Sequence, residues 1–415
     1  MSRKNRLFIY GYNGFRNVGA DCRIMPIVEH LKRLVPDAEL VVNTFHRHNL
    51  AFLEGAAVDY FHPTTYPFAA KRRIESADAT ILCEGNMLTD EFTPHMVQAF
   101  TIAMRQGAAA GVPTIGLALD SGVLSPKREP RVIEALNTLS LLTARSAGGA
   151  EVLRSRGVTA PIETTADCAV NMRLPSESRR QRLLDRLGML GGPVYGIAPV
   201  DFPMFPARIS PIGRREDFVR WPFKGTWPDD GRRRSAALLR EWTSYAHHLL
   251  SMHPRAKVAV IAMDPSDTQF AQRLWRSIGR PERTLLVVGR DHDPLDVSAL
   301  LGGLRTLTSS RYHGVVLSLP YAVPYIALGH DTRTLFLSQE LDVEEFFIEH
   351  TTPTLQADLR DRHEALVASD DDVRARIRRG FHAMQERDLD NYRHIGRVLE
   401  RVGYAVEPVA SAAGV

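Results

Sequence analysis

The chain has 415 residues, of which 44% are hydrophobic and 24% charged. This balance is typical of a soluble globular protein, and the length favours two domains of roughly 150–200 residues each. The 52 basic and 48 acidic side chains leave a formal charge of +4, an excess too small to indicate a nucleic-acid partner.

Targeting and metal-binding signals are missing from the sequence. No apolar segment after the N-terminal residues is long enough for a signal peptide or a membrane span. Cys22, Cys83 and Cys168 lie far apart without CxxC spacing, which is typical of thiols in a reducing cytoplasm. The clustered histidines lack the i, i+4 spacing of a helical metal site. We therefore predict a cytoplasmic protein with no metal and no tightly bound cofactor.

The first half of the chain alternates apolar runs with amphipathic segments. Strands are predicted at residues 7–10, 38–43, 79–83, 114–119 and 139–144, and helices at 24–35, 92–110 and 147–155. Strands that are apolar throughout belong to parallel sheets with helices on both faces. Residues 1–174 are therefore predicted to form a Rossmann-like, doubly wound α/β domain, in which a loop with three glycines follows the first strand.

A second series of strands begins after residues 175–186, a polar and basic stretch typical of a linker. It comprises residues 194–199, 257–263, 285–288, 304–307 and 325–328, with helices at 234–252 and 295–301. This pattern predicts a second Rossmann-like domain over residues 190–370. Its insertion at 201–234 is rich in Pro, Arg and aromatic residues and long enough for a lid or substrate loop. Residues 371–405 form a C-terminal segment whose helix, up to 402, is expected to pack outward.

The most informative motif is Thr308-Ser309-Ser310-Arg311-Tyr312-His313-Gly314. It follows an apolar strand and opens onto an apolar stretch expected to be helical, so a guanidinium, an imidazole and helix N-terminal amides would share one ligand. Such a set of donors favours an anion. The alternative is that Arg311 caps a loop carbonyl and His313 packs in the core.

Five segments, taken in chain order, resemble the polysaccharide pyruvyl transferase family. The first resembles the family's opening loop G-Y-x-G-x-x-N-x-G-D-E, and the last, the most specific, contains Ser310-Arg311-Tyr312-His313, similar to S-R-x-H. The segments are residues 11–21, 143–157, 165–167, 258–264 and 310–331. The resemblance implies two Rossmann-like domains facing a cleft, an arrangement like that of glycosyltransferase-B (GT-B) enzymes.

The resemblance also implies an activity, in which pyruvate moves from phosphoenolpyruvate, as co-substrate, onto two hydroxyls of a sugar as a cyclic ketal. Arg311 and His313 would bind this donor, with Arg145 as the candidate for an additional arginine. His313 could also protonate the donor's methylene carbon, because histidine commonly serves as a general acid in enzymes. The acceptor would be a carbohydrate or a lipid-linked saccharide, and a lipid-linked acceptor would bring the chain to a membrane surface.

Each attack by a sugar hydroxyl needs a base, and three carboxylates are candidates. They are Asp21, Glu84 and Asp120, all near strand ends of the first domain. The last two stand where the family often has glycine, so the chain departs from the family pattern there. For each of the three, the alternative role is a helix cap or a surface carboxylate.

The glycine-containing loop is expected to let the acceptor or its carrier approach the backbone, with Gly11, Asn13, Asn17 and Gly19 as its candidate residues. Its spacing is not G-x-G-x-x-G, so it indicates no nucleotide by itself. Two other functions fit the same architecture. One is a GT-B glycosyltransferase that uses a nucleotide sugar, and the other is a repurposed homologue that acts on a small molecule or binds without catalysis.

Overall fold

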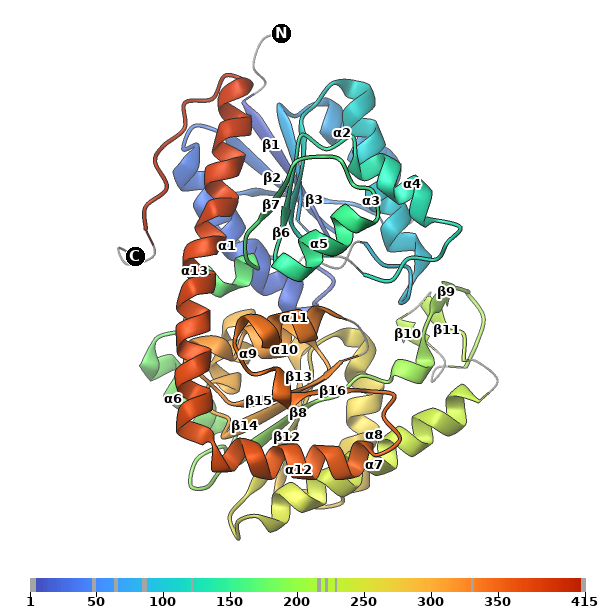
Figure 1. The fold of residues 1–415 in the computed structure, drawn as a ribbon, viewed down its shortest axis with the longest axis vertical. Coiled ribbons are helices and arrows are strands. Elements are labelled where there is room, and N and C mark those ends of the chain that lie inside the picture. Colours follow the sequence, from blue (N-terminus) through green and yellow to red (C-terminus); the bar gives the residue numbers. More distant parts are fainter. Residues whose placement is uncertain are drawn as a thin grey trace. The chain divides into compact units, whose positions relative to one another are not determined.

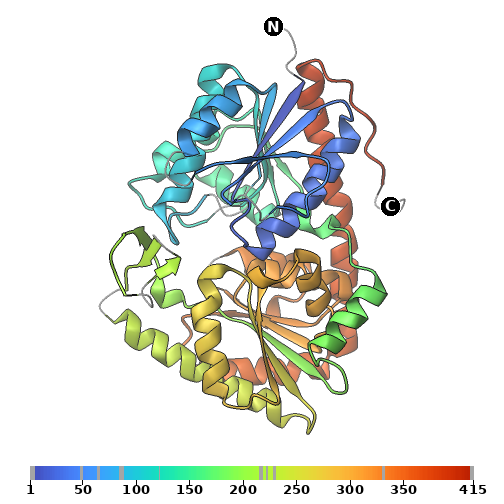
Figure 2. The same ribbon diagram turned by 180° about the vertical axis from the view of Figure 1, so that it is seen from behind.

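A computed structural model describes residues 5–46, 50–62, 66–83, 88–120, 122–214, 218–220, 223–227, 230–329 and 332–411. The chain forms two compact units, each built around its own sheet (Figures 1 and 2). The first unit comprises Met1–Arg16, Ala20–Met172 and His382–Val415, and the second comprises Asn17–Gly19 and Arg173–Phe381.

The sheet of the first unit has seven strands in the order β3-β2-β1-β4-β5-β6-β7. All neighbouring strands are parallel, and the order reverses between β1 and β4, as in a Rossmann-type sheet. The strands are β1 (Arg6–Tyr10), β2 (Glu39–Thr44), β3 (Ala57–Tyr60), β4 (Ala79–Leu82), β5 (Thr114–Leu119), β6 (Leu141–Ala144) and β7 (Ile162–Thr164). The parallel sheet predicted from the apolar runs is confirmed.

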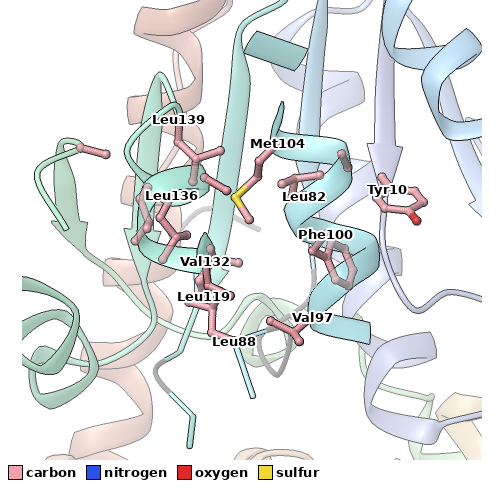
Figure 3. Packing of buried hydrophobic residues seen from close by; sticks show 14 of the residues in the cluster. Tyr10, Leu82, Leu88, Val97, Phe100, Met104, Leu119, Val132, Leu136 and Leu139 are labelled. Atoms are coloured by element: carbon pink, nitrogen blue, oxygen red, sulfur yellow. The ribbon is translucent and has the colours of Figure 1, made fainter. Parts of the chain in front are cut away.

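Helices cover both faces of this sheet. On one face α2 (Tyr66–Glu75), α3 (Pro94–Ala110), α4 (Glu129–Leu136) and α5 (Ala147–Ser155) enclose an apolar core that includes Phe100 and Met104 (Figure 3). On the other face, α1 (Val18–Leu34) packs with the C-terminal part of α13 (Asp370–Arg401). Helix α3 is capped at its N-terminus by Thr93, whose side chain accepts a hydrogen bond from the His95 amide, and at its C-terminus by Gly111 in the left-handed region.

The charge pattern of helix α13 predicts that it packs outward, and this prediction is wrong. One face is buried, including Leu389, Tyr392 and Leu399. The buried Asn391 amide accepts from Thr143 (2.5 Å) and Thr165 (2.8 Å) and donates to the Ala166 carbonyl (3.0 Å). This polar network fixes the helix against the carboxyl ends of β6 and β7, because a buried amide with satisfied donors and acceptors stabilises one docking position.

The sheet of the second unit has six parallel strands in the order β13-β12-β8-β14-β15-β16, which reverses between β8 and β14. The strands are β8 (Val194–Ala198), β12 (Lys257–Ala262), β13 (Thr284–Val288), β14 (Thr306–Ser309), β15 (Tyr325–Gly329) and β16 (Phe347–Glu349). The prediction of a second Rossmann-like sheet is confirmed, with β16 as a strand that the sequence analysis missed. The fold class is therefore α/β with two doubly wound sheets.

The helices of the second unit correct two expectations. The stretch that resembled a linker contains a helix, α6. The apolar run after His313 contains the short α10 and one 3-10 turn, Leu319–Tyr321, before the chain enters β15. The helices are α6 (Glu177–Arg186), α7 (Gly231–Ser251), α8 (Thr268–Ile278), α9 (Pro294–Leu301), α10 (Tyr312–Val316), α11 (Thr332–Glu340) and α12 (Leu355–Ala368). Ser176 caps α6 by accepting from the Arg179 amide, which explains a helix in so polar a sequence.

The insertion folds into a small antiparallel sheet of its own, in the order β10-β11-β9. Its strands are β9 (Ala207–Ile209), β10 (Phe218–Arg220) and β11 (Phe223–Gly225). Trp221, one of the aromatic residues noted in the sequence, lies outside the described residues. Within the part of the chain that the structure describes, no helix is long and apolar enough to cross a membrane.

Candidate functional site

The candidate site lies at the carboxyl edge of the second unit's sheet, where the strand order reverses between β8 and β14. Ser309 pairs with Ala198 across these strands, and the Ser310 amide donates to the Ala198 carbonyl (2.8 Å). Open parallel sheets bind ligands at such a reversal point, outside the carboxyl ends of the strands. The Arg311-Tyr312-His313 motif therefore begins where a ligand is expected.

Arg311 is held in a fixed orientation by two residues that follow β12. Its Nε donates to Asp267 Oδ2 (2.9 Å), and its Nη2 donates to Asp267 Oδ1 (2.5 Å) and to Ser266 Oγ (3.0 Å). The Asp267 side chain is only 2% exposed, whereas that of Arg311 is 20% exposed. The pair therefore places a partly accessible guanidinium on a buried carboxylate.

The buried carboxylate of Asp267 is itself fixed by a tight turn. The Asp264 amide donates to Asp267 Oδ2 (3.0 Å), and the Asp264 side chain accepts from the Ser266 amide (2.8 Å). Burial raises the pKa of Asp267 to about 6, while the positive charge of Arg311 and its hydrogen bonds oppose that rise. Arg311 therefore favours the charged form of this carboxylate, whereas the negative charge of Asp264 in the turn raises its pKa.

His313 lies in the first turn of α10, beside residues 17–19, which belong to the same unit. A Cβ added at Gly19 would come within 2.2 Å of His313 Nδ1, so a larger residue at this position would displace the imidazole. Asn17 Nδ2 donates to Asp264 Oδ2 (2.6 Å). The structure thus places Gly19 next to His313 of the predicted donor-binding motif, and Asn17 on Asp264, in the turn that holds Asp267.

Asp201 is a carboxylate at the same reversal point that the sequence analysis did not select. It follows β8 and is 6% exposed, and Ser235 Oγ donates to its Oδ2 (2.8 Å). Its Oδ1 is buried and has no hydrogen-bond partner among the described residues. Burial raises the pKa of Asp201 to about 6, against the lowering effect of the Ser235 hydrogen bond and Arg273. The sequence signal that could have identified Asp201 is a carboxylate three positions after an apolar strand.

Arg145 and Asp120, a predicted donor-binding residue and a predicted base, pair with each other in the first unit. Arg145 Nε donates to Asp120 Oδ2 (2.8 Å) and Nη1 donates to Asp167 Oδ2 (2.9 Å). All three side chains are at most 2% exposed. Arg145 and Asp120 therefore belong to a buried charge cluster that connects the segments following β5, β6 and β7. Their roles in donor binding and catalysis stay predictions.

The other predicted residues of the first unit are distributed along its carboxyl edge. The Gly11 amide donates to Asn43 Oδ1 (2.8 Å), and Asn13 Nδ2 donates to the same oxygen (3.2 Å), so Asn43 ties the loop to β2. Asp21 is buried in the first turn of α1, where a carboxylate is favoured by the helix dipole. Glu84 lies outside the described residues, as do Gly85, Asn86, Ser121, His330 and Asp331.

No group of three or more His, Cys, Asp or Glu side chains suited to a metal ion occurs among the residues that the structure describes. Arg311, backed by Asp267, is a partly accessible positive charge at the second unit's carboxyl edge, with His313 two residues further on. A guanidinium held in this way can bind an anion.

Comparison with solved structures identifies the fold. The chain is similar to Anabaena Alr3699/HepE in complex with UDP, with a TM-score of 0.55 and 15% identity over 95% of this chain and 100% of that one. It is also similar to a UDP-GlcNAc 2-epimerase from Neisseria meningitidis bound to UDP-GlcNAc (TM-score 0.63, 10% identity, 95% and 99% covered). A glycosyltransferase from Rickettsia africae gives a TM-score of 0.54 at 9% identity, with 97% and 99% covered. At these identities the likeness shows the fold alone, which is GT-B-like.

Comparison by sequence identifies the family. No curated protein matches the chain. The family model for polysaccharide pyruvyl transferases matches residues 24–332, and the chain belongs to this family. Its membership supports a carbohydrate-modifying transferase, in agreement with the resemblance found in the Arg311-Tyr312-His313 motif.

Proposed function

We propose that the chain transfers the pyruvyl group of phosphoenolpyruvate to two hydroxyls of a saccharide, forming a cyclic ketal. The observation that carries the proposal is the Arg311–Asp267 pair at the reversal point of the second sheet, which fixes a guanidinium where a ligand is expected. Phosphoenolpyruvate carries a carboxylate and a phosphate close together, and a fixed guanidinium suits such planar and multiply charged acid groups better than an ammonium does.

The reaction needs one acid and one base. His313 would deliver a proton to the methylene carbon of the donor, which becomes the methyl group of the product. The resulting cationic centre is attacked by one hydroxyl, phosphate leaves with its bonding electron pair, and the second hydroxyl closes the ketal. The two hydroxyl protons balance the proton given to carbon and the one that leaves with phosphate or a base. Asp201, in the same unit as His313, is a proposed base, and the role of Asp21 as a base stays a prediction from the sequence.

Phosphoenolpyruvate would act as a co-substrate, with no tightly bound cofactor, and the reaction would take place in the cytoplasm. The acceptor is a saccharide, either free or carried on a lipid. A lipid carrier would add peripheral association with a membrane surface.

A second candidate is transfer or rearrangement of a nucleotide sugar. It is favoured by the similar folds of proteins described in complex with UDP or bound to UDP-GlcNAc. The two candidates differ in the anion that they require, since a nucleotide sugar carries a diphosphate and a base, whereas phosphoenolpyruvate carries neither.

The experiment is calorimetric titration of the full chain with phosphoenolpyruvate, UDP and UDP-GlcNAc in parallel. The proposal expects saturable binding of phosphoenolpyruvate that neither UDP ligand displaces. Binding of UDP or UDP-GlcNAc, without binding of phosphoenolpyruvate, would overturn it in favour of the second candidate.

A further inference from the structure

We infer that Asp267 is a positioning residue of the donor site, which orients Arg311 so that the site selects a donor with two acid groups over a simple anion. The inference rests on the proposed function. It adds a residue that neither the R-x-H motif nor any chemistry of the donor identifies, because Asp267 carries the wrong charge to bind phosphoenolpyruvate itself.

The geometry fixes Arg311 at both ends. At the backbone, the Arg311 amide donates to Ser309 Oγ (3.1 Å) and Ser309 Oγ donates to the Arg311 carbonyl (2.8 Å). At the guanidinium, the Nε and Nη2 edge is held by the two oxygens of Asp267. A long side chain that is constrained at both ends loses little further entropy when a ligand binds, which is the benefit of preorganisation.

The carboxylate can serve as a rigid support because it is fixed independently of Arg311. The Asp264 amide holds Oδ2, and the surrounding turn of residues 264–267 has reciprocal hydrogen bonds between its ends. The Asp267 side chain is buried, so it does not exchange its partner for solvent. Asp267 and Ser266 therefore set the plane of the guanidinium, and the ligand binds to a guanidinium held in this plane.

Two effects of removing the carboxylate oppose one another. Loss of a negative charge near the site favours any anion, whereas loss of the two-point contact lets the guanidinium rotate. Rotation harms a donor that must place two acid groups at once, and it hardly affects a small symmetric anion. The positioning role therefore predicts a loss of affinity for the donor with two acid groups and no loss for the small anion, which a merely structural role does not.

The test compares phosphoenolpyruvate with inorganic phosphate on the full chain, measured by calorimetry for wild type, Asp267→Asn and Ser266→Ala. For Asp267→Asn we expect phosphoenolpyruvate affinity to fall by about tenfold or more, the order of effect of a lost orienting partner. Inorganic phosphate should bind unchanged or more tightly. Ser266→Ala, which removes one hydrogen bond and no charge, should show a smaller loss for phosphoenolpyruvate only.

The matched control is Asp370→Asn, which also removes a carboxylate that binds arginines of the same unit, Arg305 and Arg374, but one on α13. It should leave both affinities unchanged. If wild type binds phosphoenolpyruvate and Asp267→Asn binds it equally well, the positioning role is overturned and the proposed function stands. The positioning role is also overturned if Asp267→Asn loses affinity for both anions equally. If Asp267→Asn does not fold, an unchanged phosphoenolpyruvate affinity in Ser266→Ala overturns it. Failure of wild type to bind phosphoenolpyruvate would overturn both.

Discussion

Asp267 and Arg311 form a two-point ion pair, with N–O distances of 2.9 and 2.5 Å, between the turns that follow β12 and β14. The pair joins positions 44 residues apart in the chain. The fold of the second unit therefore determines the orientation of the Arg311 guanidinium.

His313 can be tested as the proton donor by the His313→Gln change. The glutamine retains hydrogen-bonding capacity but cannot deliver a proton, so we expect kcat to fall by about 10²–10⁴-fold with phosphoenolpyruvate affinity within a few-fold of wild type. Acceptor-dependent phosphate release measures the rate. His247→Gln, on the exposed side of α7, is the control and should retain the wild-type rate. A His313→Gln enzyme with full kcat would exclude the proposed acid.

Gly19 can be tested by adding a single methyl group. In Gly19→Ala the new Cβ would lie 2.2 Å from His313 Nδ1, so the imidazole must move and activity should fall by an order of magnitude or more, since misplaced catalytic groups are costly. Gly396→Ala, in helix α13, meets the side chains of Val406 at 3.0 Å and Leu34 at 3.7 Å, both away from His313, and serves as the control. Unchanged activity in Gly19→Ala would show that the position of the His313 ring does not matter.

Arg145 is expected to matter for stability more than for donor binding. Arg145→Gln leaves Asp120 and Asp167 buried without their cation, and breaking a buried ion pair in this way costs about 3–5 kcal/mol. Urea unfolding should show this loss, while the folded variant should bind phosphoenolpyruvate like wild type. The opposite pattern, with stability kept and donor binding lost, would establish the donor-binding role suggested by the family resemblance.

His363 should make stability depend on pH. Burial, together with His248 and Arg305, lowers its pKa from 6.5 to about 4, and its Nε2 lies 3.0 Å from Thr306 Oγ1. The unfolded chain therefore binds a proton before the folded chain does. The stabilisation is complete above pH 6.5 and decreases as pH falls towards 4, by at most about 1.4 kcal/mol per pH unit.

The measurement for His363 is the unfolding free energy of wild type and His363→Gln between pH 4 and 8, compared as a difference so that other titrating groups cancel. The difference should change with pH only in the acid part of this range. A difference that is constant with pH would mean that His363 has the same pKa in the folded and unfolded chain.

Much of the fold could be predicted because the strands are long apolar runs. In both units, such runs gave the central strands in their correct chain positions, and parallel sheets need strands of that kind. The prediction was poor for short or polar elements. Helix α6 was taken for a linker because only Leu183 and Leu184 are buried in an otherwise polar sequence. Helix α13 was predicted as a helix, but its packing was not, because nothing in a charged sequence marks Asn391 as buried.

The site was predictable only where it is local in sequence. Arg311 and His313 stand two residues apart after a strand, and the structure places them at the carboxyl edge as expected. The partners of charged residues cannot be found in this way, because they depend on which strands are neighbours. Thus Arg145 and Asp120 were assigned separate roles although they bind each other, and Asp267 was not selected at all.

The most direct test of the account is the calorimetric affinity for phosphoenolpyruvate of wild type and Arg311→Lys. Lysine keeps the positive charge but not the fork that binds Asp267 and an acid group together, so the affinity should fall by about tenfold or more. Arg374→Lys is the matched control, since Arg374 is 19% exposed and also binds an aspartate, Asp370, in the second unit. It should bind phosphoenolpyruvate like wild type. Equal affinities in wild type and Arg311→Lys would contradict the account, because the donor would then be held elsewhere.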